Sequence, residues 1–412
     1  MKICVLGLGY IGLPTASVLA TAGHEVVGVD VNARVVELIN HGQIHIEEKG
    51  LKTLFGAAVR SGNLTASRKP VAADAFILCV PTPETNHKAD LTFLVEAAKS
   101  VAPVLKKGNL LVVESTIPPG ATEKVVLPEL EKTKLEPGKD YHVAHCPERV
   151  LPGSILKELV ENDRVIGGLT PACAKRAAEV YGSFVQGHIA IVDLRTAETV
   201  KLVENSFRDV NIAFANTVSN IALEMGIDSE EVIRCANMHP RVNILKPGPG
   251  VGGHCIPIDP WFLVEAAPAA TALLKAARRV NDDRPVVMAK ILKRLVGRVR
   301  KPKVAILGVS YKGDVDDVRD TPADIAIDAL EKFGIDVAVY DPHVKIYRKD
   351  LVTLEQALAG ADAAAILSAH SDFKYLAPDR VGGLMRARRL LDPFHMVDLA
   401  AWRDAGFEVV TV

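Results

Sequence analysis

The sequence predicts an α/β protein in which two doubly wound, parallel-sheet domains are joined by a long central helix and a helical segment. An apolar run at residues 2–6 leads into a glycine-rich turn and then into a helical pattern at residues 13–22. Residues 196–225 contain neither Pro nor Gly, and apolar side chains recur there at helical spacing. From residue 303 the strand–turn–helix order of the N-terminus is repeated. Strands that alternate with helices are typical of parallel sheets covered on both faces.

The composition is that of a globular protein without a strongly charged surface. Of 412 residues, 49% are hydrophobic and 24% are charged, and the formal net charge is -1. Such a balance argues against nucleic acid or a membrane surface as a partner. The six cysteines are scattered without disulfide or metal-ligand spacing, as expected in a reducing cytosol. We find no signal peptide and no apolar run of spanning length, so we expect a cytoplasmic protein with no metal centre.

The glycine-rich turn near the N-terminus predicts a Rossmann-like dinucleotide site. Gly7-Leu-Gly-Tyr-Ile-Gly12 follows a strand pattern and opens a helical one, and Asp30 ends the next strand pattern, 18 residues after Gly12. Two of these glycines permit the turn and the approach of pyrophosphate, and the third permits contact between helix and strand. Asp30 would bind a ribose 2′-hydroxyl and repel a 2′-phosphate, which favours NAD over NADP. The alternative is a glycine turn in another α/β fold. The expected cofactor residues are Gly7, Gly9, Tyr10, Ile11, Gly12 and Asp30.

Polar side chains follow three further strand patterns. Thr82, Thr116 and Glu148 each come just after an apolar, strand-like run. The carboxyl ends of strands form the edge where ligands bind in an open α/β sheet. We therefore expect these side chains to contact cofactor or substrate. Ordinary turn and cap chemistry is the alternative for the threonines, and a structural ion pair, suggested by the adjacent Arg149, is the alternative for Glu148.

The long helical pattern carries a polar line. Lys201, Asn205 and Arg208 recur at spacings of four and three, which places them on one helix face. A Lys beside a reacting oxygen stabilises developing negative charge, and an Asn positions a water. A solvated helix face is the alternative. A helix of this length suits a bridge between two domains or a subunit interface, so we expect a homodimer or a larger assembly.

A glycine- and proline-rich loop at residues 247–261 surrounds a single cysteine. Cys255 follows two glycines and His254, and Asp259 lies four residues further on. One interpretation is a positioned thiolate nucleophile; the other is a tight turn that holds a small, inert apolar side chain. Arg241, just before the loop, offers a cation for an anionic ligand.

The C-terminal part echoes the N-terminal module with changes. Residues 303–313 repeat the pattern of residues 2–12, but Ser310 replaces the middle glycine and a charged segment follows. This departure argues against a second dinucleotide and favours a phosphate-bearing partner contacted by Lys312 and Arg319; a solvated acidic loop is the alternative. Further elements are expected in this part: a mostly helical stretch over residues 266–295 and strands at 336–341, 361–368, 397–398 and 408–412.

Seven short motifs occur in order along the chain. They are Gly7-Leu-Gly-Tyr-Ile-Gly-Leu-Pro14, Val80-Pro-Thr-Pro83, Glu114-Ser-Thr-Ile-Pro-Pro-Gly120, Cys146-Pro-Glu-Arg-Val-Leu-Pro-Gly153, Lys201-Leu-Val-Glu-Asn-Ser-Phe-Arg-Asp-Val-Asn211, Gly250-Val-Gly-Gly-His-Cys255 and Tyr311-Lys-Gly-Asp314. Together they resemble the UDP-glucose/GDP-mannose dehydrogenase family over nearly the whole chain. The segments around Glu148 and Cys255 are most similar to the branch that acts on UDP-N-acetylmannosamine. Pro152 and His254 depart from the UDP-glucose branch, which typically has Glu and Ser at these positions.

The resemblance implies two successive oxidations of a sugar C6 alcohol to a carboxylate, with two NAD+ consumed in each turnover. Cys255 matches the nucleophile, which would hold the aldehyde as a thiohemiacetal and then as a thioester that water hydrolyses. Lys201, Asn205 and Asp259 match family residues that stabilise the C6 oxyanion and handle water and protons. Glu148 matches a carboxylate placed for hydrolysis.

The resemblance also implies the remaining binding residues. Thr82, Thr116 and Arg319 join the cofactor site, and Thr116 also lies near the hydrolysis step. The implied contacts to the UDP-sugar are Glu148, Arg149, Val150, Lys201, Asn205, Arg208, Arg241, Gly252 and Lys312. The expected division of the chain is an NAD-binding domain at residues 1–190, a helical dimerisation segment with the cysteine loop at residues 191–297, and a UDP-sugar-binding domain at residues 298–412.

The expected substrate is UDP-N-acetyl-D-mannosamine, and the expected product is UDP-N-acetyl-D-mannosaminuronate. The same chemistry on UDP-N-acetylglucosamine or UDP-glucose remains an alternative. Two alternatives belong to other classes. One is a two-electron hydroxyacid dehydrogenase, which needs no cysteine loop, and the other is an NAD-sensing protein without turnover. Loss of acid formation on replacing Cys255, with NAD binding retained, would distinguish the four-electron reaction from both alternatives.

Overall fold

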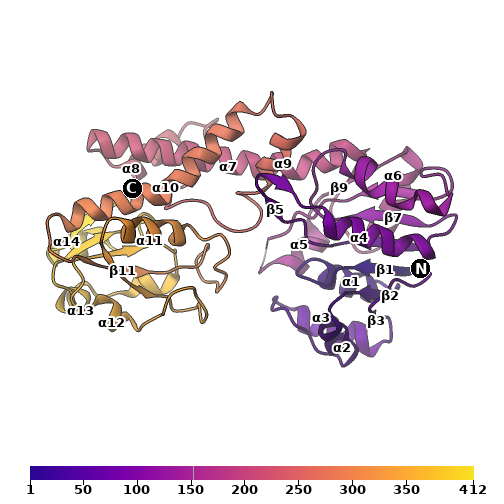
Figure 1. Ribbon diagram of the computed structural model, residues 1–412, viewed down its shortest axis with the longest axis horizontal. Helices are drawn as coiled ribbons and strands as arrows, with labels where there is room; N and C mark the ends of the chain where they lie inside the picture. The colour runs from indigo at the N-terminus through magenta and orange to yellow at the C-terminus, as the bar shows by residue number, and fades with distance from the viewer. Residues whose placement is uncertain (152) are drawn as a thin grey trace. The chain divides into compact units, whose positions relative to one another are not determined.

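The computed structural model describes residues 1–151 and 153–412 and confirms the predicted α/β fold class (Figure 1). Pro152, which the motif comparison uses, lies outside the described residues. The chain forms two compact units, Met1–Glu204 with Trp261–Pro268 and Asn205–Pro260 with Ala269–Val412. Helices α7 (Leu194–Met225) and α9 (Asp259–Ala266) each contribute residues to both units.

The first unit contains an eight-stranded sheet in the order β10-β9-β8-β7-β4-β1-β2-β3. The strands are parallel, except that β9 and β10 run opposite to the other six. From β3 to β8 the order is that of a dinucleotide-binding sheet, with its switch point between β1 and β4. The strands are β1 (Lys2–Leu6), β2 (Glu25–Val29), β3 (Leu64–Ser67), β4 (Ala75–Leu78), β7 (Leu110–Val113), β8 (His142–His145), β9 (Arg164–Gly168) and β10 (Ile189–Asp193).

Helices cover both faces of this sheet. Leu13, Phe55 and Tyr181 pack α1, α3 and α6 against one face, and Leu94 and Leu130 pack α4 and η3 against the other. A small hairpin, β5 (Glu84–Thr85) and β6 (Lys88–Ala89), follows β4. The helices are α1 (Gly12–Thr21), α2 (Ala33–Asn40), α3 (Leu51–Arg60), α4 (Thr92–Val101), η1 (Ala102–Val104), η2 (Thr122–Val126), η3 (Leu127–Thr133), α5 (Ile155–Glu161) and α6 (Pro171–Tyr181).

The second unit contains a five-stranded parallel sheet in the order β12-β11-β13-β14-β15. Helices α10 and α11 cover one face and α12 and α14 the other. The strands are β11 (Lys303–Leu307), β12 (Asp336–Tyr340), β13 (Ala363–Ile366), β14 (Arg389–Leu391) and β15 (Glu408–Val410), and the helices are α8 (Ser229–Ala236), α10 (Ala272–Val296), α11 (Pro322–Lys332), α12 (Leu354–Leu358), η4 (Ser371–Tyr375), α13 (Pro378–Leu384) and α14 (Leu399–Asp404).

Residues 266–295 are mostly helical, as expected; the helix is α10, which begins at Ala272 after the chain has left α9 and passed Pro268. One expectation for this part of the chain is wrong. The pair at 397–398 is not a strand, because the Asp398 carboxylate accepts the backbone N–H groups of Ala400 and Ala401 and caps α14. On the side of β13 away from β11 lies β14, a short strand that the sequence pattern did not reveal.

A buried polar network ties α7 to α10. The guanidinium of Arg278 donates to the carboxylate of Asp209, and the two side chains are 2% and 0% exposed. Asn281 donates to the same carboxylate oxygen at 2.8 Å and accepts from Asn216 at 2.9 Å. Asn216 in turn accepts the backbone N–H of Gly248 at 2.9 Å. The network therefore joins two helices to the start of the cysteine loop.

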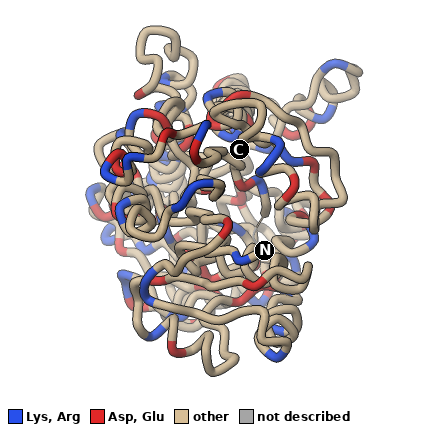
Figure 2. The backbone as a smooth tube through the Cα atoms, turned by 90° about the vertical axis from the view of Figure 1, so that its right-hand side faces the viewer, with Lys and Arg blue, Asp and Glu red and all other residues tan. Residues whose placement is uncertain are grey.

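Charge is evenly mixed along both units. Lys and Arg are interspersed with Asp and Glu along the described chain (Figure 2), in keeping with the formal net charge of -1. Among the described residues we find no helix that is both long enough and apolar enough to cross a membrane.

We expect Asp209→Ala to lower the free energy of unfolding of the second unit by about 3 kcal/mol, because it removes the buried partner of Arg278 and leaves only the half-exposed carboxylate of Asp282. Urea unfolding followed by fluorescence measures this effect, since buried Trp402 reports on the second unit. Glu231→Ala, which breaks the exposed pair with Arg234 on α8, is the matched control and should change little. Equal effects of the two changes would contradict the role given to the network.

Candidate active site

The glycine turn of the first unit has the geometry expected of a dinucleotide site. Gly7 follows β1 with φ 90°, and a Cβ on it would lie 2.6 Å from the Cys79 carbonyl oxygen. A Cβ on Gly12 would lie 1.8 Å from the Gly7 carbonyl oxygen, so α1 approaches the strand end as only glycine permits. Gly9 has no atom within 4 Å of its Cβ position, which leaves space for a ligand above the turn.

Asp30 lies at the end of β2 and supports the same turn. One carboxylate oxygen accepts the Leu8 N–H at 3.0 Å, and the other accepts the Asn32 N–H at 2.8 Å. Tyr10 is about half exposed, and Ile11 is the residue that precedes α1. These residues line the amino end of α1, where unpaired N–H groups attract an anion.

Two of the expected strand-end residues are in direct contact. The Thr82 hydroxyl donates to the Thr116 carbonyl oxygen at 2.6 Å, which joins the segments that follow β4 and β7. Ser115 donates to the Val80 carbonyl oxygen at 2.7 Å in the same place. The threonines therefore share one edge of the sheet, as their positions in the sequence predict.

Glu148 forms the ion pair that was considered as its alternative, but with a different arginine. Its carboxylate, 7% exposed, accepts from the Arg164 guanidinium at 3.1 Å and from the Arg149 backbone N–H at 2.7 Å. The Arg149 guanidinium instead binds Glu204 of α7 and the Asp163 carbonyl oxygen. Burial opposes the charge on Arg164, but Glu148 and other nearby groups raise its pKa above the ordinary value.

A second buried carboxylate, which sequence reasoning missed, lies close to this pair. Glu114 accepts from the Tyr181 hydroxyl at 2.5 Å and from the Cys79 thiol at 2.9 Å. Burial, and then the charge of Glu148, raise the pKa of Glu114, while Arg164 acts in the opposite direction. The sequence did carry a sign of this buried group. Arg164 begins one strand-like run and Glu114 follows another, and a charge at such a position needs a buried partner.

The polar line on α7 meets the cysteine loop through one hydrogen bond. The Asn205 amide donates to the Asp259 carboxylate at 2.6 Å, and both side chains are buried. Lys201 lies one helical turn before Asn205 and is half-buried, whereas Arg208 is exposed. The expected residues Asn205 and Asp259, 54 positions apart in the chain, are thus brought together.

Cys255 is exposed and lies four residues before the start of α9. Its carbonyl oxygen accepts the N–H groups of Ile258 and Asp259, so a single turn connects the thiol-bearing residue to the helix. A Cβ on Gly252 would lie 2.6 Å from the Asp320 carbonyl oxygen, and one on Gly253 would lie 2.9 Å from the Tyr311 ring. These glycines therefore allow the loop to pack tightly against the segment that follows β11.

His254, which the sequence left without a role, lies beside this segment. Its Nδ1 is 4.0 Å from the Asp320 carboxylate. Burial and the charge of Arg319 lower the pKa of His254, against the opposite effects of Asp320 and Asp317. The Arg319 guanidinium makes a two-pronged ion pair with Asp317, with Nε–Oδ1 at 2.8 Å and Nη2–Oδ2 at 2.6 Å. Of the other expected cations, Lys312 and Arg241 are exposed in the same unit.

The strand–turn–helix module of the second unit repeats the contact between carboxylate and turn that Asp30 makes in the first unit, but a buried ring also binds the carboxylate. Asp341, at the end of β12, accepts the Val309 N–H at 2.7 Å, as Asp30 does from Leu8. Its second partner is the fully buried ring of His370, at 3.0 Å. A Cβ on Gly308 would lie 2.6 Å from the Ser368 Cβ. The Asp341 carboxylate is therefore bonded to a buried ring as well as to the turn.

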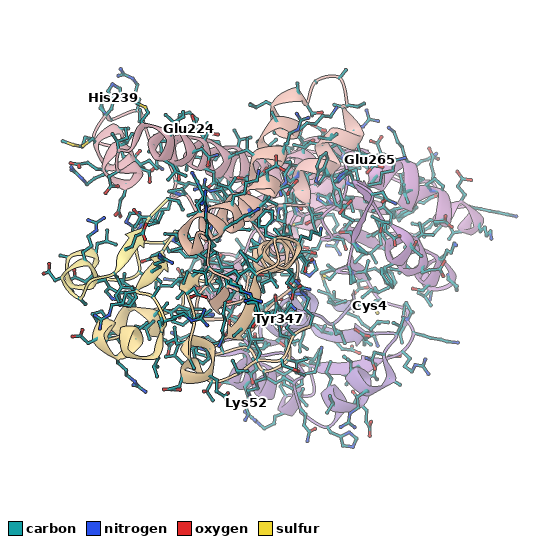
Figure 3. The ribbon with its side chains drawn as sticks, turned by 60° about the vertical axis from the view of Figure 1, so that its left-hand side comes forward. Cys4, Lys52, Glu224, His239, Glu265 and Tyr347 are labelled. Carbon is teal, nitrogen blue, oxygen red and sulfur yellow. The ribbon has the colours of Figure 1, made fainter. Side chains whose placement is uncertain are left out.

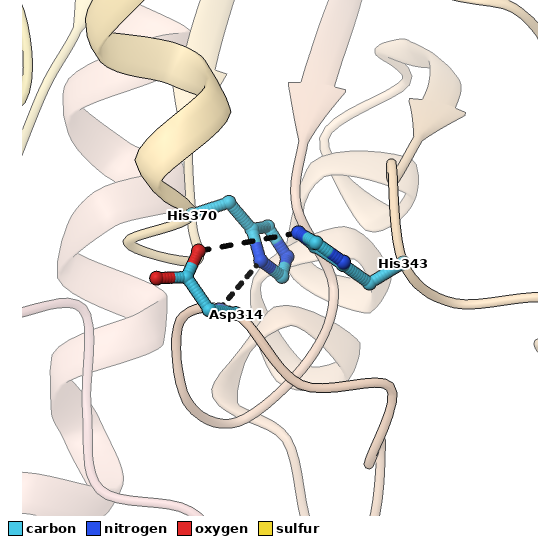
Figure 4. Close-up of side chains that lie close together, drawn as sticks. All are labelled: Asp314, His343 and His370. Atoms are coloured by element: carbon cyan, nitrogen blue, oxygen red, sulfur yellow. Dashed lines mark hydrogen bonds and ion pairs between the residues drawn. The ribbon is translucent and has the colours of Figure 1, made fainter.

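Asp314, His343 and His370 form the one group with metal-like ligand spacing among the described residues (Figure 4). The His370 ring already uses both nitrogens, because Nδ1 accepts the Asp314 N–H at 2.9 Å and Nε2 lies 3.0 Å from Asp341. His343 pairs with Asp372 at 3.0 Å. Hydrogen bonds and ion pairs therefore account for the cluster without an ion.

Comparisons with known proteins identify the family. The NAD binding domain of the UDP-glucose/GDP-mannose dehydrogenase family matches residues 1–185, the central domain residues 195–283 and the UDP binding domain residues 305–399. A UDP-N-acetyl-D-mannosamine dehydrogenase of Methanococcus maripaludis is 47% identical, covering 99% of this chain and 96% of its own. An NDP-N-acetyl-D-galactosaminuronic acid dehydrogenase of Ralstonia nicotianae is 48% identical, covering 92% and 93%.

The same resemblance extends to solved structures. A UDP-D-ManNAc dehydrogenase from Pyrococcus horikoshii superimposes with a TM-score of 0.94 at 40% identity, covering 100% of this chain and 99% of its own. The expected NAD cofactor is confirmed by the match to the NAD binding domain, and the UDP binding domain indicates a UDP-sugar substrate. On these matches over nearly its whole length, the chain belongs to the UDP-glucose/GDP-mannose dehydrogenase family.

Proposed function

We propose that the protein oxidises the C6 alcohol of UDP-N-acetyl-D-mannosamine to the carboxylate of UDP-N-acetyl-D-mannosaminuronate. Full-length relatives that bear the name of this activity support the substrate, and the NAD binding domain supports the oxidant. The reaction removes four electrons, so each sugar reduces two NAD+. Each NAD+ accepts one hydride from the sugar carbon.

Cys255 is the proposed nucleophile between the two oxidations. The first oxidation turns the alcohol into an aldehyde and releases a proton. The Cys255 thiolate adds to the aldehyde carbon and forms a thiohemiacetal, so the aldehyde does not diffuse away. Loss of a second hydride from that carbon gives a thioester. Water attacks the thioester, the C–S bond breaks, and the carboxylate leaves with the thiol restored.

The hydrogen bond between Asn205 and Asp259 carries this proposal. It brings the polar line of α7 to the first residue of α9, four residues after Cys255. Lys201 and Asn205 are proposed to stabilise the C6 oxyanion, and Asp259 to handle the proton and the water. The exposed position of Cys255 leaves its thiol accessible to substrate. Thr116 and Glu148 are proposed to serve the hydrolysis step, with Glu148 held in place by Arg164.

The proposed cofactor site is the turn at the end of β1. Gly7, Gly9 and Gly12 make the approach for pyrophosphate, and Asp30 receives the ribose. The open space at Gly9 supports this assignment. The further proposed contacts to the cofactor are Tyr10, Ile11, Thr82, Thr116 and Arg319.

The UDP-sugar is proposed to bind through the second unit and the segment after β8. The exposed cations Arg241 and Lys312 suit a diphosphate. Arg149, Val150, Lys201, Asn205, Arg208 and Gly252 complete the proposed set, together with Glu148. The Ralstonia relative is named for N-acetyl-D-galactosaminuronic acid and is as similar in sequence to this chain as the Methanococcus relative. The uronic acid of an N-acetylgalactosamine nucleotide is therefore the rival product. UDP-N-acetylglucosamine and UDP-glucose remain further alternatives.

We also propose the organisation expected from the sequence: cofactor domain at residues 1–190, central segment at 191–297 and UDP-sugar domain at 298–412, in a cytoplasmic enzyme. Cysteines without disulfide spacing support that compartment. Full-length similarity to UDP-sugar dehydrogenases favours the four-electron reaction over a hydroxyacid dehydrogenase or an NAD sensor.

A second copy of the chain is the proposed partner of α7. Phe207, Phe214, Ile221 and Met225 are 66%, 55%, 50% and 67% exposed. They recur at spacings of seven, seven and four, which aligns them on the helix face opposite the buried network. An apolar stripe of this kind on a long helix suits pairing with its own copy about a two-fold axis. Figure 3 shows Glu224 on this helix and His239 beyond α8.

We expect Cys255→Ala to abolish acid formation, by about 10³-fold or more, while NAD+ binding persists, because only the covalent step is lost. The measurement is NADH released per UDP-sugar consumed, with UDP-N-acetylmannosamine, UDP-N-acetylglucosamine, UDP-glucose and UDP-N-acetylgalactosamine. Two NADH per molecule of the first sugar is the expected wild-type result. Cys235→Ala removes another exposed thiol, on α8, and is the matched control.

One NADH per sugar from the wild type would contradict the four-electron reaction. Full NADH production by Cys255→Ala would contradict the thioester mechanism. Preference for another sugar in the panel would reassign the substrate and leave the mechanism standing.

We expect Asp30→Ala to reduce the affinity for NAD+ relative to NADP+ by about 10- to 100-fold, because it removes a charged acceptor for the 2′-hydroxyl and a repulsion of the 2′-phosphate. Calorimetric titration with NAD+ and with NADP+ gives the ratio of the two affinities. A general loosening of the turn would weaken both cofactors alike and leave this ratio unchanged. Glu25→Ala, at the other end of β2, is the control. An unchanged ratio would remove Asp30 from the cofactor site.

We expect wild-type protein to have twice the chain mass in light scattering, and Phe214→Glu to be monomeric at micromolar concentration, because a carboxylate in the apolar stripe is costly to bury. Lys290→Glu changes an exposed position of α10 and is the control. A wild-type monomer, or a Phe214→Glu dimer of undiminished stability, would refute pairing through this face.

A further inference from the structure

The hairpin of β5 and β6 contains a backbone conformation that its residues do not favour. Its two turn residues, Asn86 and His87, both have positive φ, 53° and 62°. A two-residue turn of this type favours glycine, above all at the second position. Asn tolerates the left-handed region well, whereas a side chain as large as His occupies it at a cost. Something must therefore hold His87 in place.

The ring of His87 lies on a tryptophan of α9. The His87 and Trp261 ring centroids are 3.7 Å apart and the planes are inclined by 25°, which is a stacked pair. The His87 N–H donates to the Glu84 carboxylate, which fixes the turn from the other side. Both rings belong to the first unit. The stack and this hydrogen bond thus hold His87 in its unfavourable conformation.

A second contact between the hairpin and α9 reinforces the stack. The Ala89 N–H donates to the Glu265 carboxylate at 3.0 Å. Glu265, labelled in Figure 3, follows Trp261 by one helical turn, so both contacts use one face of α9. One strand residue, Ala89, and the ring of one turn residue, His87, therefore attach the hairpin to the helix.

The chain on each side of this contact leads to proposed catalytic groups. Asp259 is the first residue of α9, two positions before Trp261, and its N–H is bonded to the Cys255 carbonyl oxygen. On the other side, the hairpin begins two residues after Thr82, whose hydroxyl is bonded to the Thr116 segment. The stack thus joins the strand-end edge of the cofactor-binding unit to the helix that starts at Asp259.

We propose that the β5–β6 hairpin is a clamp that holds residues 261–266 of α9 in the first unit and thereby steadies the chain that leads back to Asp259 and Cys255. His87 and Trp261 are positioning residues in this proposal, which rests on the UDP-sugar oxidation proposed above. The clamp acts through the chain connection of α9, since neither ring belongs to the proposed set that contacts the sugar or the cofactor. Small displacements of reacting groups have large effects on rate, which gives the clamp its importance.

The test is His87→Gly, which removes the ring and also relieves the unfavourable backbone conformation. We expect kcat for NADH production to fall about tenfold or more, with unchanged NAD+ affinity and a melting temperature that does not fall. Asn86→Gly is the matched control, because it relieves the same kind of conformation in the same turn and leaves the stack intact. It should keep wild-type kcat. Trp261→Leu should resemble His87→Gly, Trp261→Phe should recover part of the loss, and the double variant His87→Gly with Trp261→Leu should be no slower than either single one.

Amide hydrogen exchange of residues 261–268 is the readout that does not depend on substrate. His87→Gly should accelerate exchange there, and Asn86→Gly should not. The proposal would be overturned if His87→Gly kept the wild-type exchange rates and the wild-type kcat. It would also be overturned if kcat fell equally in His87→Gly and Asn86→Gly, because the turn and not the stack would then be responsible. A wild-type protein that oxidises no UDP-sugar would refute the proposed function by a separate measurement. The effect of the clamp on kcat would then be refuted as well, even if His87→Gly still accelerated amide exchange in residues 261–268.

Discussion

The buried pair of Asp209 and Arg278 constrains the arrangement of the second unit. A charge removed from water is tolerated only with a well-placed partner, so α7 and α10 must pack in the register that satisfies both side chains. Asn281 and Asn216 extend this network through amide hydrogen bonds, and Asn216 accepts the backbone N–H of Gly248. The start of the cysteine loop is therefore positioned by helix packing. The loop does not need to be stable by itself to hold its place.

The two sheets illustrate how one local design serves two purposes. In both, a carboxylate at the end of the second strand accepts an N–H from the turn after the first strand, as Asp30 and Asp341 show. In the first module the turn remains open at Gly9. In the second, the His370 ring occupies the corresponding crevice and binds the carboxylate itself. A single buried side chain thus distinguishes the turn of the second module from that of the first.

The first unit concentrates buried charge beneath its ligand edge. Glu148 and Glu114 share the influence of one cation, Arg164, and burial raises the pKa of Glu114. Such a group of ionisable side chains is costly to assemble and is typical of functional sites, where proton positions must be controlled. Tyr181 and Cys79 complete it as hydrogen-bond donors to Glu114. The network fixes the position of Glu148, the carboxylate proposed to serve the hydrolysis step.

Local patterns in the sequence determined the two α/β modules, the dinucleotide turn and the long helix, because apolar periodicity and glycine placement act over a few residues. They missed β14 and misassigned residues 397–398, because short runs carry too little periodicity to reveal their pairing. Only the tertiary structure decided that Asn205 meets Asp259, that Glu148 pairs with Arg164, and that the glycines beside Cys255 serve close packing. These contacts join residues far apart in the chain, and their partners are selected by burial and hydrogen bonding across elements, which no local pattern encodes.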